Sequence, residues 1–280
     1  MAVKTSPIAS ICGDVVSFHI QGEDWEQYTE APSRMDERGK NLKRTAREIY
    51  AWSHCNHQGV LPLLGFVCFQ GQMALVTPWM GAGSLKQYIM KGLLLKPLRT
   101  CSQLAAAVEY LHVTGVVHGD IKPDNILMTD QGNAQIADFG NAVLTRPTSL
   151  DFTHTTSFNC TIRFTAPEVL REQSRIFTKE SDIYALGMTM FNIMTGQPPF
   201  AEESVLSFMN AIINMAQPPQ PDFGDSLRGH TAKDEMWNLL RRCLAYAPSE
   251  RPNAKEVKAA LTKLEQLNNM LGRELECRLC

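Results

Sequence analysis

Acidic, amide and cationic side chains gather in residues 118–125, which read HGDIKPDN. Asp120 offers a carboxylate that can orient a hydroxyl group, and the ammonium group of Lys122 lies two residues further on. Asn125, and Asp138 in the sequence Asp-Phe-Gly, offer oxygen atoms of the kind that Mg²⁺ prefers. A hydroxyl-orienting acceptor, a shielding cation and oxygen ligands for a metal are together what transfer of a phosphoryl group requires.

The stretch between these two groups predicts the element that brings them together. Residues 116–120 (VVHGD), 125–130 (NILMTD) and 134–140 (AQIADFG) read as short strand-turn-strand pieces, and Gln131-Gly132-Asn133 reads as a turn. A hairpin here would place Asp120, Asn125 and Asp138 in one cleft. A third motif, Ala-Pro-Glu at 166–168, follows in the chain. Each motif alone is weak, whereas the three in this order are not explained by structural accident.

The remaining periodicities predict an α+β protein with a small strand-bearing lobe and a larger helical lobe. Residues 60–69 and 73–79 read as strands, and residues 1–45 are polar and are expected to be irregular. Helices are expected over 99–112, 182–194, 233–245 and 254–275. After Asp182 the second of these helices carries no charge, so we expect it to be buried on all sides.

Composition excludes several classes of protein. The 280 residues are 44% hydrophobic and 20% charged, with a net charge of −2, so a basic face for nucleic acid is not expected. The eight cysteines show no zinc-binding spacing and indicate a reducing compartment. No apolar run is long enough to span a membrane, and a cytoplasmic protein is expected. The oligomeric state stays open.

The three motifs resemble the catalytic loop, the metal-binding loop and the end of the activation segment of the eukaryotic protein kinase superfamily, over about residues 44–265. The segments TPWMGAGSL and DFGNAVL are similar to the corresponding segments of fungal tyrosine-kinase-like Ser/Thr protein kinases. The resemblance implies one bilobal kinase domain. Residues 1–80 would form a partial N-lobe without its first two strands and glycine-rich loop, and residues 81–280 would form the C-lobe.

This resemblance also implies the roles of individual residues. Asp120 and Lys122 would be catalytic, and Asn125 and Asp138 would hold Mg²⁺. ATP would contact a set of residues from both lobes, namely Lys4, Glu48, Thr77, Met80 and Leu127. Within this set Glu48 would pair with the lysine that grips the ATP phosphates, Thr77 would be the gatekeeper, and Met80 would belong to the hinge. Lys4, in the opening Ala-Val-Lys, is the candidate for that lysine.

Further matches concern the framework and the acceptor. Asp182 stands where the family has an aspartate that holds the backbone of the catalytic loop. Arg251 stands where an arginine pairs with the glutamate of Ala-Pro-Glu, here Glu168. Thr161 matches a threonine of Ser/Thr kinases, and with Lys122 it favours Ser/Thr hydroxyls of protein substrates over Tyr.

One departure leaves the activity open. The 280 residues contain no GxGxxG segment, although the family places one before the Ala-Val-Lys strand. Loss of that loop would weaken nucleotide binding, because positioning is most of catalysis here. An active Ser/Thr kinase and an impaired pseudokinase, scaffold or truncated kinase product therefore both remain. A small-molecule phosphotransferase of the aminoglycoside type is a third reading, which Lys122, Ala-Pro-Glu and Arg251 disfavour.

Overall fold

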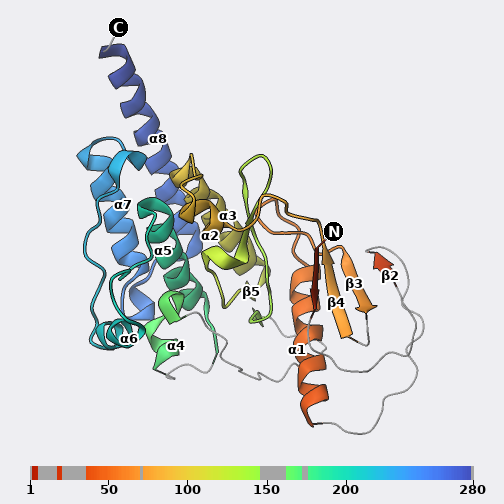
Figure 1. Ribbon diagram of the computed structural model, residues 1–280. Coiled ribbons are helices and arrows are strands. Elements are labelled where there is room, and N and C mark those ends of the chain that lie inside the picture. Colours follow the sequence, from red (N-terminus) through yellow and green to blue (C-terminus); the bar gives the residue numbers. More distant parts are fainter. Residues whose placement is uncertain are drawn as a thin grey trace.

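The structure is a computed structural model that describes residues 2–5, 18–20, 36–69, 72–145, 162–171 and 176–278. Thr161 lies outside this described part. The chain forms a small part built on a β-sheet and a larger part built of helices, on the right and left of Figure 1 respectively. The α+β class expected from the sequence is confirmed.

The small part is an antiparallel sheet with one helix beside it (Figure 1). Its strand order is β1-β4-β3-β2, and its elements are β1 (Ala2–Thr5), β2 (Phe18–Ile20), α1 (Asp36–Ser53), β3 (Gly65–Phe69) and β4 (Gln72–Thr77). The expectation that residues 1–45 are irregular was wrong in part, because β1, β2 and the start of α1 fall there. β1 and β2 are short strands whose structure depends on backbone pairing with β4 and β3, which local periodicity does not reveal.

The large part is built mainly of helices. These are α2 (Leu85–Met90), α3 (Pro97–Thr114), α4 (Pro167–Leu170), α5 (Lys179–Thr195), α6 (Val205–Ile213), α7 (Gly229–Cys243) and α8 (Ala254–Arg278). The predicted helices are confirmed, with ends that differ by a few residues. Residues 181–194 of α5 are buried, as its lack of charge after Asp182 predicts. α3 packs against both α5 and α8.

Short strands and turns complete the described chain. Two antiparallel pairs join β5 (Val116–Val117) to β8 (Val143–Leu144) and β6 (Ile126–Met128) to β7 (Ala134–Ile136). Four 3₁₀ turns lie at η1 (Pro123–Asn125), η2 (Ile162–Phe164), η3 (Gly224–Ser226) and η4 (Pro248–Glu250). The predicted hairpin between the first two motifs is therefore confirmed as β6–β7.

The segment that follows α1 joins the two parts. The amide of Leu61 donates to the carbonyl of Ile136 at 2.9 Å, and the amide of Ile136 donates to the carbonyl of Gly59 at 2.8 Å. His57 stacks on Tyr110 of α3, with ring centroids 5.0 Å apart. Burial and the neighbouring Lys258 lower the pKa of His57, which favours a neutral ring where its Nδ1 accepts the amide of Gly59. Backbone pairing and ring packing therefore fix the end of α1 against the hairpin.

A buried arginine ties the end of the chain to the middle of the large part. The guanidinium of Arg251 forms a two-bonded ion pair with Glu168, at 2.7 and 2.8 Å. It also donates to the carbonyls of Glu180, Ala245 and Tyr246. The side chain is 0% exposed, so its charge depends wholly on these partners. The pairing predicted between Arg251 and Glu168 is confirmed.

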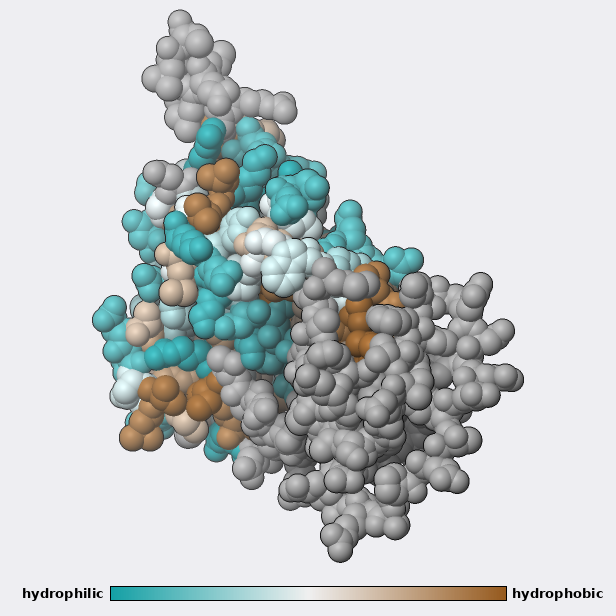
Figure 2. All heavy atoms as spheres, turned by 45° about the vertical axis from the view of Figure 1, so that its right-hand side comes forward, coloured by the Kyte–Doolittle hydropathy of each residue, from teal (hydrophilic) through white to brown (hydrophobic). Residues whose placement is uncertain are grey.

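The structure also bears on the expectations for the cysteines, for membrane-spanning segments and for the surface. Cys243 is fully buried, and burial raises the pKa of its thiol to about 12, as for a small apolar side chain. No helix in the described ranges is both long and apolar enough to cross a membrane. Much of the described surface in Figure 2 is hydrophilic, with apolar side chains exposed in a few places, one of them in the region of α6.

We predict that Arg251→Met lowers the free energy of unfolding by about 3–5 kcal/mol, because it leaves the Glu168 carboxylate without its cation. Urea denaturation followed by circular dichroism measures this change. The control is Arg241→Met, since Arg241 is exposed on α7. Equal denaturation midpoints for the two variants would contradict a structural role for the ion pair.

Candidate functional site

The candidate site is built from two loops held at the ends of the β6–β7 hairpin. The loop of residues 118–125 leads into β6, and Asp138 follows β7 after one intervening residue. Strand pairing sets Ile126 opposite Ile136, and the amide of Ala137 donates to the carbonyl of Asn125 at 2.8 Å. The hairpin register thus brings Asn125 next to the residue that precedes Asp138, as the sequence predicted.

Asp120 is the centre of the polar contacts in this loop. Its Oδ2 atom accepts from the Nζ of Lys122 at 2.7 Å and from the Nδ2 of Asn125 at 2.8 Å. Nδ2 of Asn125 also donates to the main-chain carbonyl of Asp120 at 2.9 Å. The side chains of Asp120 and Lys122 are 14% and 13% exposed, so both are largely shielded yet reachable. A carboxylate, an ammonium group and an amide therefore meet at one place.

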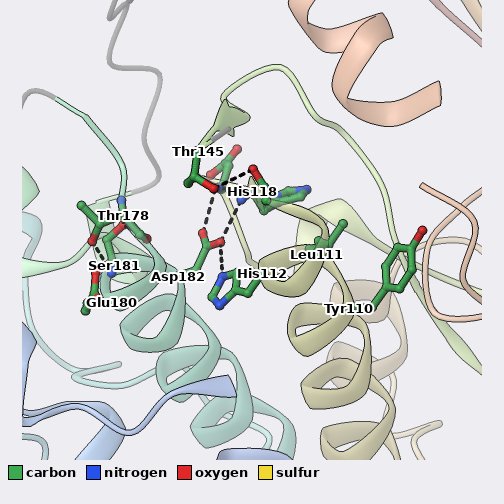
Figure 3. Close-up of polar contacts among 12 residues, drawn as sticks. Tyr110, Leu111, His112, His118, Thr145, Thr178, Glu180, Ser181 and Asp182 are labelled. Carbon is green, nitrogen blue, oxygen red and sulfur yellow. Dashed lines mark hydrogen bonds and ion pairs between the residues drawn. The ribbon is translucent and has the colours of Figure 1, made fainter. Parts of the chain in front are cut away.

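The backbone of this loop is held by Asp182, at the start of α5 (Figure 3). Its Oδ2 atom accepts from the amide of His118 and its Oδ1 atom from the amide of Gly119, both at 2.8 Å. The Nε2 atom of His112 on α3 donates to the same Oδ2 atom at 2.9 Å. The carboxylate is 1% exposed, and these donors compensate for its burial. The predicted role of Asp182 is confirmed.

The ring of His118 joins the two loops. Its Nδ1 atom accepts from the amide of Asp120 at 3.3 Å, so the ring proton lies on Nε2. Nε2 in turn donates to the carbonyl of Ala137 at 3.1 Å. The neutral tautomer is thus set by its neighbours. Because Ala137 precedes Asp138, this one ring couples the position of Asp120 to that of Asp138.

Aromatic packing extends this connection to the small part of the molecule. Phe139 lies edge-on to His118, with centroids 5.0 Å apart, and stacks on Trp52 of α1 at 5.2 Å. Trp52 is fixed in turn, because its Nε1 atom donates to the carbonyl of Leu61 at 2.5 Å. All three rings are buried. The end of α1 is therefore packed directly against the loop that carries Asp138.

Two positions in these loops have left-handed backbone. Asp138 has φ of 67°, and its Oδ1 atom accepts from the amide of Gly140 at 3.3 Å. A non-glycine residue in this region is uncommon and often marks a functional site. Gly119 has φ of 76°, and a Cβ atom there would lie 2.7 Å from the carbonyl oxygen of Asn141 and 2.8 Å from Phe177. Glycine therefore permits the close approach of the two loops.

The segment between the two parts holds further predicted residues. Thr77 ends β4 and is buried, and Met80 is half-buried two residues after Pro78. The carbonyl of Met80 accepts from the amide of Gly83, and the carbonyl of Gly83 accepts from Met128 at 2.9 Å. Leu127, also half-buried, pairs with Ser84 across a single bridge. Backbone bonds therefore fix this connection beside β6.

The last two predicted residues lie in the small part. Lys4 is in the middle of β1, opposite Leu75 of β4, and the position of its side chain lies outside what the structure describes. Glu48 is in α1 and is 5% exposed. A charge so deeply buried needs a partner, and Glu48 has one. The pairing of Lys4 with Glu48 stays a prediction.

The oxygen atoms available at the site fit a hard divalent cation such as Mg²⁺. Since Nδ2 of Asn125 faces Asp120, its Oδ1 atom is left as an acceptor, and Asp138 contributes a carboxylate. In the described chain, no group of three or more His, Cys, Asp and Glu side chains is placed to hold a metal ion. The donor set therefore suits a metal that takes few protein ligands and completes its shell with water or phosphate oxygens.

Sequence reasoning missed His112 and the coupling role of His118. His112 is in the last turn of α3, and nothing in the local pattern distinguishes it from an ordinary buried histidine. The ring of His118 was noted only as part of the motif. His118 and Ala137 are 19 residues apart, with the β6–β7 hairpin between them. Predicting their hydrogen bond would therefore need the register of the two strands.

We predict that Asp182→Asn destabilises the protein by about 1–3 kcal/mol, because an amide has one acceptor oxygen where three N–H groups converge. Amide hydrogen exchange should speed up at His118 and Gly119, and thermal unfolding should start earlier. The matched control is Asp234→Asn, since Asp234 is exposed on α7. Unchanged exchange at the two amides would show that Asp182 does not hold the loop.

Comparison with known proteins agrees with this geometry. The sequence model of the family described as "Protein kinase domain" matches residues 30–261. The chain is 33% identical to "Serine/threonine-protein kinase PrkC" of Bacillus subtilis over 218 residues, which are 77% of this chain and 32% of that protein. It is 29% identical to "Serine/threonine-protein kinase PkaA" of Streptomyces coelicolor over 226 residues, 79% of this chain and 39% of that protein.

A plant relative shows the same similarity. "Calcium/calmodulin-regulated receptor-like kinase 1" of Arabidopsis thaliana is 29% identical over 244 residues, 83% of this chain and 54% of that protein. The chain thus spans about a third to a half of the length of these relatives. The match of the family covers most of the 280 residues and includes both loops of the site. The chain therefore belongs to the protein kinase domain family.

Proposed function

We propose that this domain transfers the γ-phosphoryl group of ATP to Ser/Thr hydroxyls of protein substrates. The observation that carries the proposal is the meeting of Asp120 with Lys122 and Asn125 on a loop held by Asp182. Phosphoryl transfer depends chiefly on positioning and on electrostatic stabilisation, and this loop offers both.

Asp120 and Lys122 are the proposed catalytic residues. The carboxylate of Asp120 accepts a hydrogen bond from the attacking hydroxyl and orients it, and it can receive that proton as the new bond forms. The ammonium group of Lys122, now 2.7 Å from Asp120, shields the charge of the phosphoryl group in transfer. Both groups are partly exposed, as contact with two substrates requires.

Asn125 and Asp138 are the proposed ligands of Mg²⁺. When bound, Mg²⁺ neutralises charge on the phosphate oxygens of the nucleotide. The protein would contribute Oδ1 of Asn125, whose Nδ2 is bonded to Asp120, and the carboxylate of Asp138, which follows the carbonyl that contacts the ring of His118. The left-handed backbone at Asp138, a conformation that often marks a functional site, supports this proposal.

We propose that the adenine base lies beside the segment from Thr77 to Met80, with Leu127 against its face. Residues 1–80 and 81–280 would then be the N-lobe and C-lobe, with the nucleotide between them. Lys4 on β1 would grip the phosphates, and Glu48 on α1 would form an ion pair with Lys4. The strand position of Lys4, paired with the strand that leads to Thr77, supports this assignment.

The choice of Ser/Thr over Tyr rests on Lys122 and on the relatives that are named as serine/threonine-protein kinases. Thr161 supports the same choice from sequence alone. The segment of residues 162–171 is anchored by the ion pair of Glu168 with Arg251, which favours a protein substrate over a small aminoglycoside-type acceptor. The similarity to fungal tyrosine-kinase-like kinases, and a cytoplasmic location, remain part of this proposal.

The alternative is a protein that binds partners without turnover. It rests on one observation, the lack of a GxGxxG segment within the 280 residues. Backbone donors from such a loop position phosphates, so nucleotide affinity decides between the two functions. An impaired kinase would keep the fold and the buried networks described above.

We predict that Mg-ATP raises the thermal midpoint of the wild-type chain and that Asp138→Ala removes this shift. A ligand that binds only the folded state stabilises it in proportion to the logarithm of its concentration over Kd. Asp130→Ala is the control, because Asp130 is an exposed acid on the same hairpin. A wild-type chain without any shift at millimolar ATP would favour the scaffold alternative.

We predict that Asp120→Asn lowers turnover by about 10²–10⁴-fold, since the hydroxyl loses its proton acceptor. Transfer of labelled phosphate from ATP to a generic Ser/Thr protein substrate measures turnover. The thermal shift with Mg-ATP should persist in this variant. Asp124→Asn is the control, because Asp124 is exposed and pairs with Lys86. Equal turnover of wild type and Asp120→Asn would refute the assignment of Asp120.

A further inference from the structure

A pocket lies in the large part of the molecule, apart from the candidate site. Its volume is about 460 Å³, and it lies between α2, the start of α3 and the turn after β6. Tyr88, Leu94 and Met128 contribute apolar walls, and Asp130, with the two residues that follow it, lines the side of the turn. The pocket is large enough to hold one or more side chains of a bound segment.

The pocket continues into an exposed apolar surface. Met90, Leu93 and Leu95 are 76%, 51% and 89% exposed, and they fall within seven residues of sequence that read MKGLLLK. Leu93 and Leu95 also line the pocket. Single exposed leucines are ordinary, whereas exposed apolar side chains that line a pocket are typical of a surface that binds another molecule.

The charge around the pocket is mainly positive. Lys96 and Arg99 line it, and both are exposed at the start of α3. Lys91 is exposed between Met90 and Leu93. Asp130 is the acidic residue among the lining side chains. A ligand that complements this surface carries apolar groups together with carboxylates. The cations around the pocket would repel basic segments and so exclude them as ligands.

We propose that this pocket is a docking site for an extended segment of a partner protein that carries apolar side chains flanked by Asp or Glu. One apolar side chain enters the pocket against Leu94 and Met128, a second covers Leu95, and the acidic groups face Lys96 and Arg99. Docking does not depend on the chemistry proposed for Asp120, because none of these residues belongs to that site.

The shape of the surface favours a peptide over a membrane. A bilayer with anionic lipids would also attract lysines, arginine and exposed leucines. However, a bilayer cannot fill a concave pocket, and the carboxylate of Asp130 beside the pocket would be driven into the headgroup region against like charge. A segment of extended chain can enter the pocket with one side chain and leave Asp130 in water.

The test selects displayed random peptides of about twelve residues on the wild-type chain without nucleotide. Enriched peptides are then labelled with fluorescein, and their Kd is measured by anisotropy at low and high salt. We expect the selected peptides to share apolar positions flanked by acids. The double variant Lys96→Glu and Arg99→Glu should weaken binding about tenfold or more and remove most of the salt dependence. Leu93→Ser with Leu95→Ser should weaken binding at any salt concentration.

Matched controls separate this site from the rest of the surface. Lys179→Glu with Lys255→Glu reverses two exposed cations beside another pocket, of about 420 Å³, and should leave peptide binding unchanged. Val205→Ser with Leu206→Ser removes two exposed apolar side chains of α6, away from the pocket, and should also leave peptide binding unchanged.

Several outcomes would overturn the proposal. These are selected peptides without acids, equal binding by the charge-reversed variant, and an empty selection. Binding of anionic vesicles that is lost in Arg99→Glu, without peptide binding, would assign the surface to a membrane. All these assays omit nucleotide, and the thermal shift with Mg-ATP is expected in every variant. Failure of docking is therefore distinguishable from failure of the proposed kinase activity.

Discussion

The arrangement of the site depends on one buried carboxylate. Asp182 is held in a nearly solvent-free position, where a negative charge is tolerated only because three N–H groups point at it. Two of these belong to the backbone of the loop that carries Asp120. The carboxylate is carried by α5, a helix whose residues 181–194 are all buried. The position of the loop is therefore set by the core in addition to the hydrogen bonds among its own residues.

Much of the site was predictable, because its chemistry is concentrated in short stretches of sequence. The residues of the loop 118–125 and Asp138 were identified from type and spacing, and the hairpin between them follows from two apolar runs and a glycine turn. Helices α3, α5, α7 and α8 follow from apolar periodicity. The ion pair of Arg251 with Glu168 came from the family resemblance, because its partners are 83 residues apart.

The rest required the folded chain. β1 and β2 are strands because β4 and β3 pair with them, and polar residues 1–45 give no local sign of this. His112 and the stacking of Phe139 between His118 and Trp52 join segments that are distant in sequence. Such contacts depend on helix packing and strand register, which single-residue patterns do not encode. The pocket beside Leu93 and Leu95 likewise forms only where three elements meet.

The position of α8 has a consequence for how this domain is made. α8 packs against α3, and Arg251 just before it closes the network of Glu168 and Glu180. During synthesis, the face of α3 that packs against α8 therefore stays uncovered until residues 251–278 have been made. The contacts between α3 and α8 are long-range in sequence, which favours slow folding. Deleting the segment from Arg251 onward would leave this intermediate as the end product.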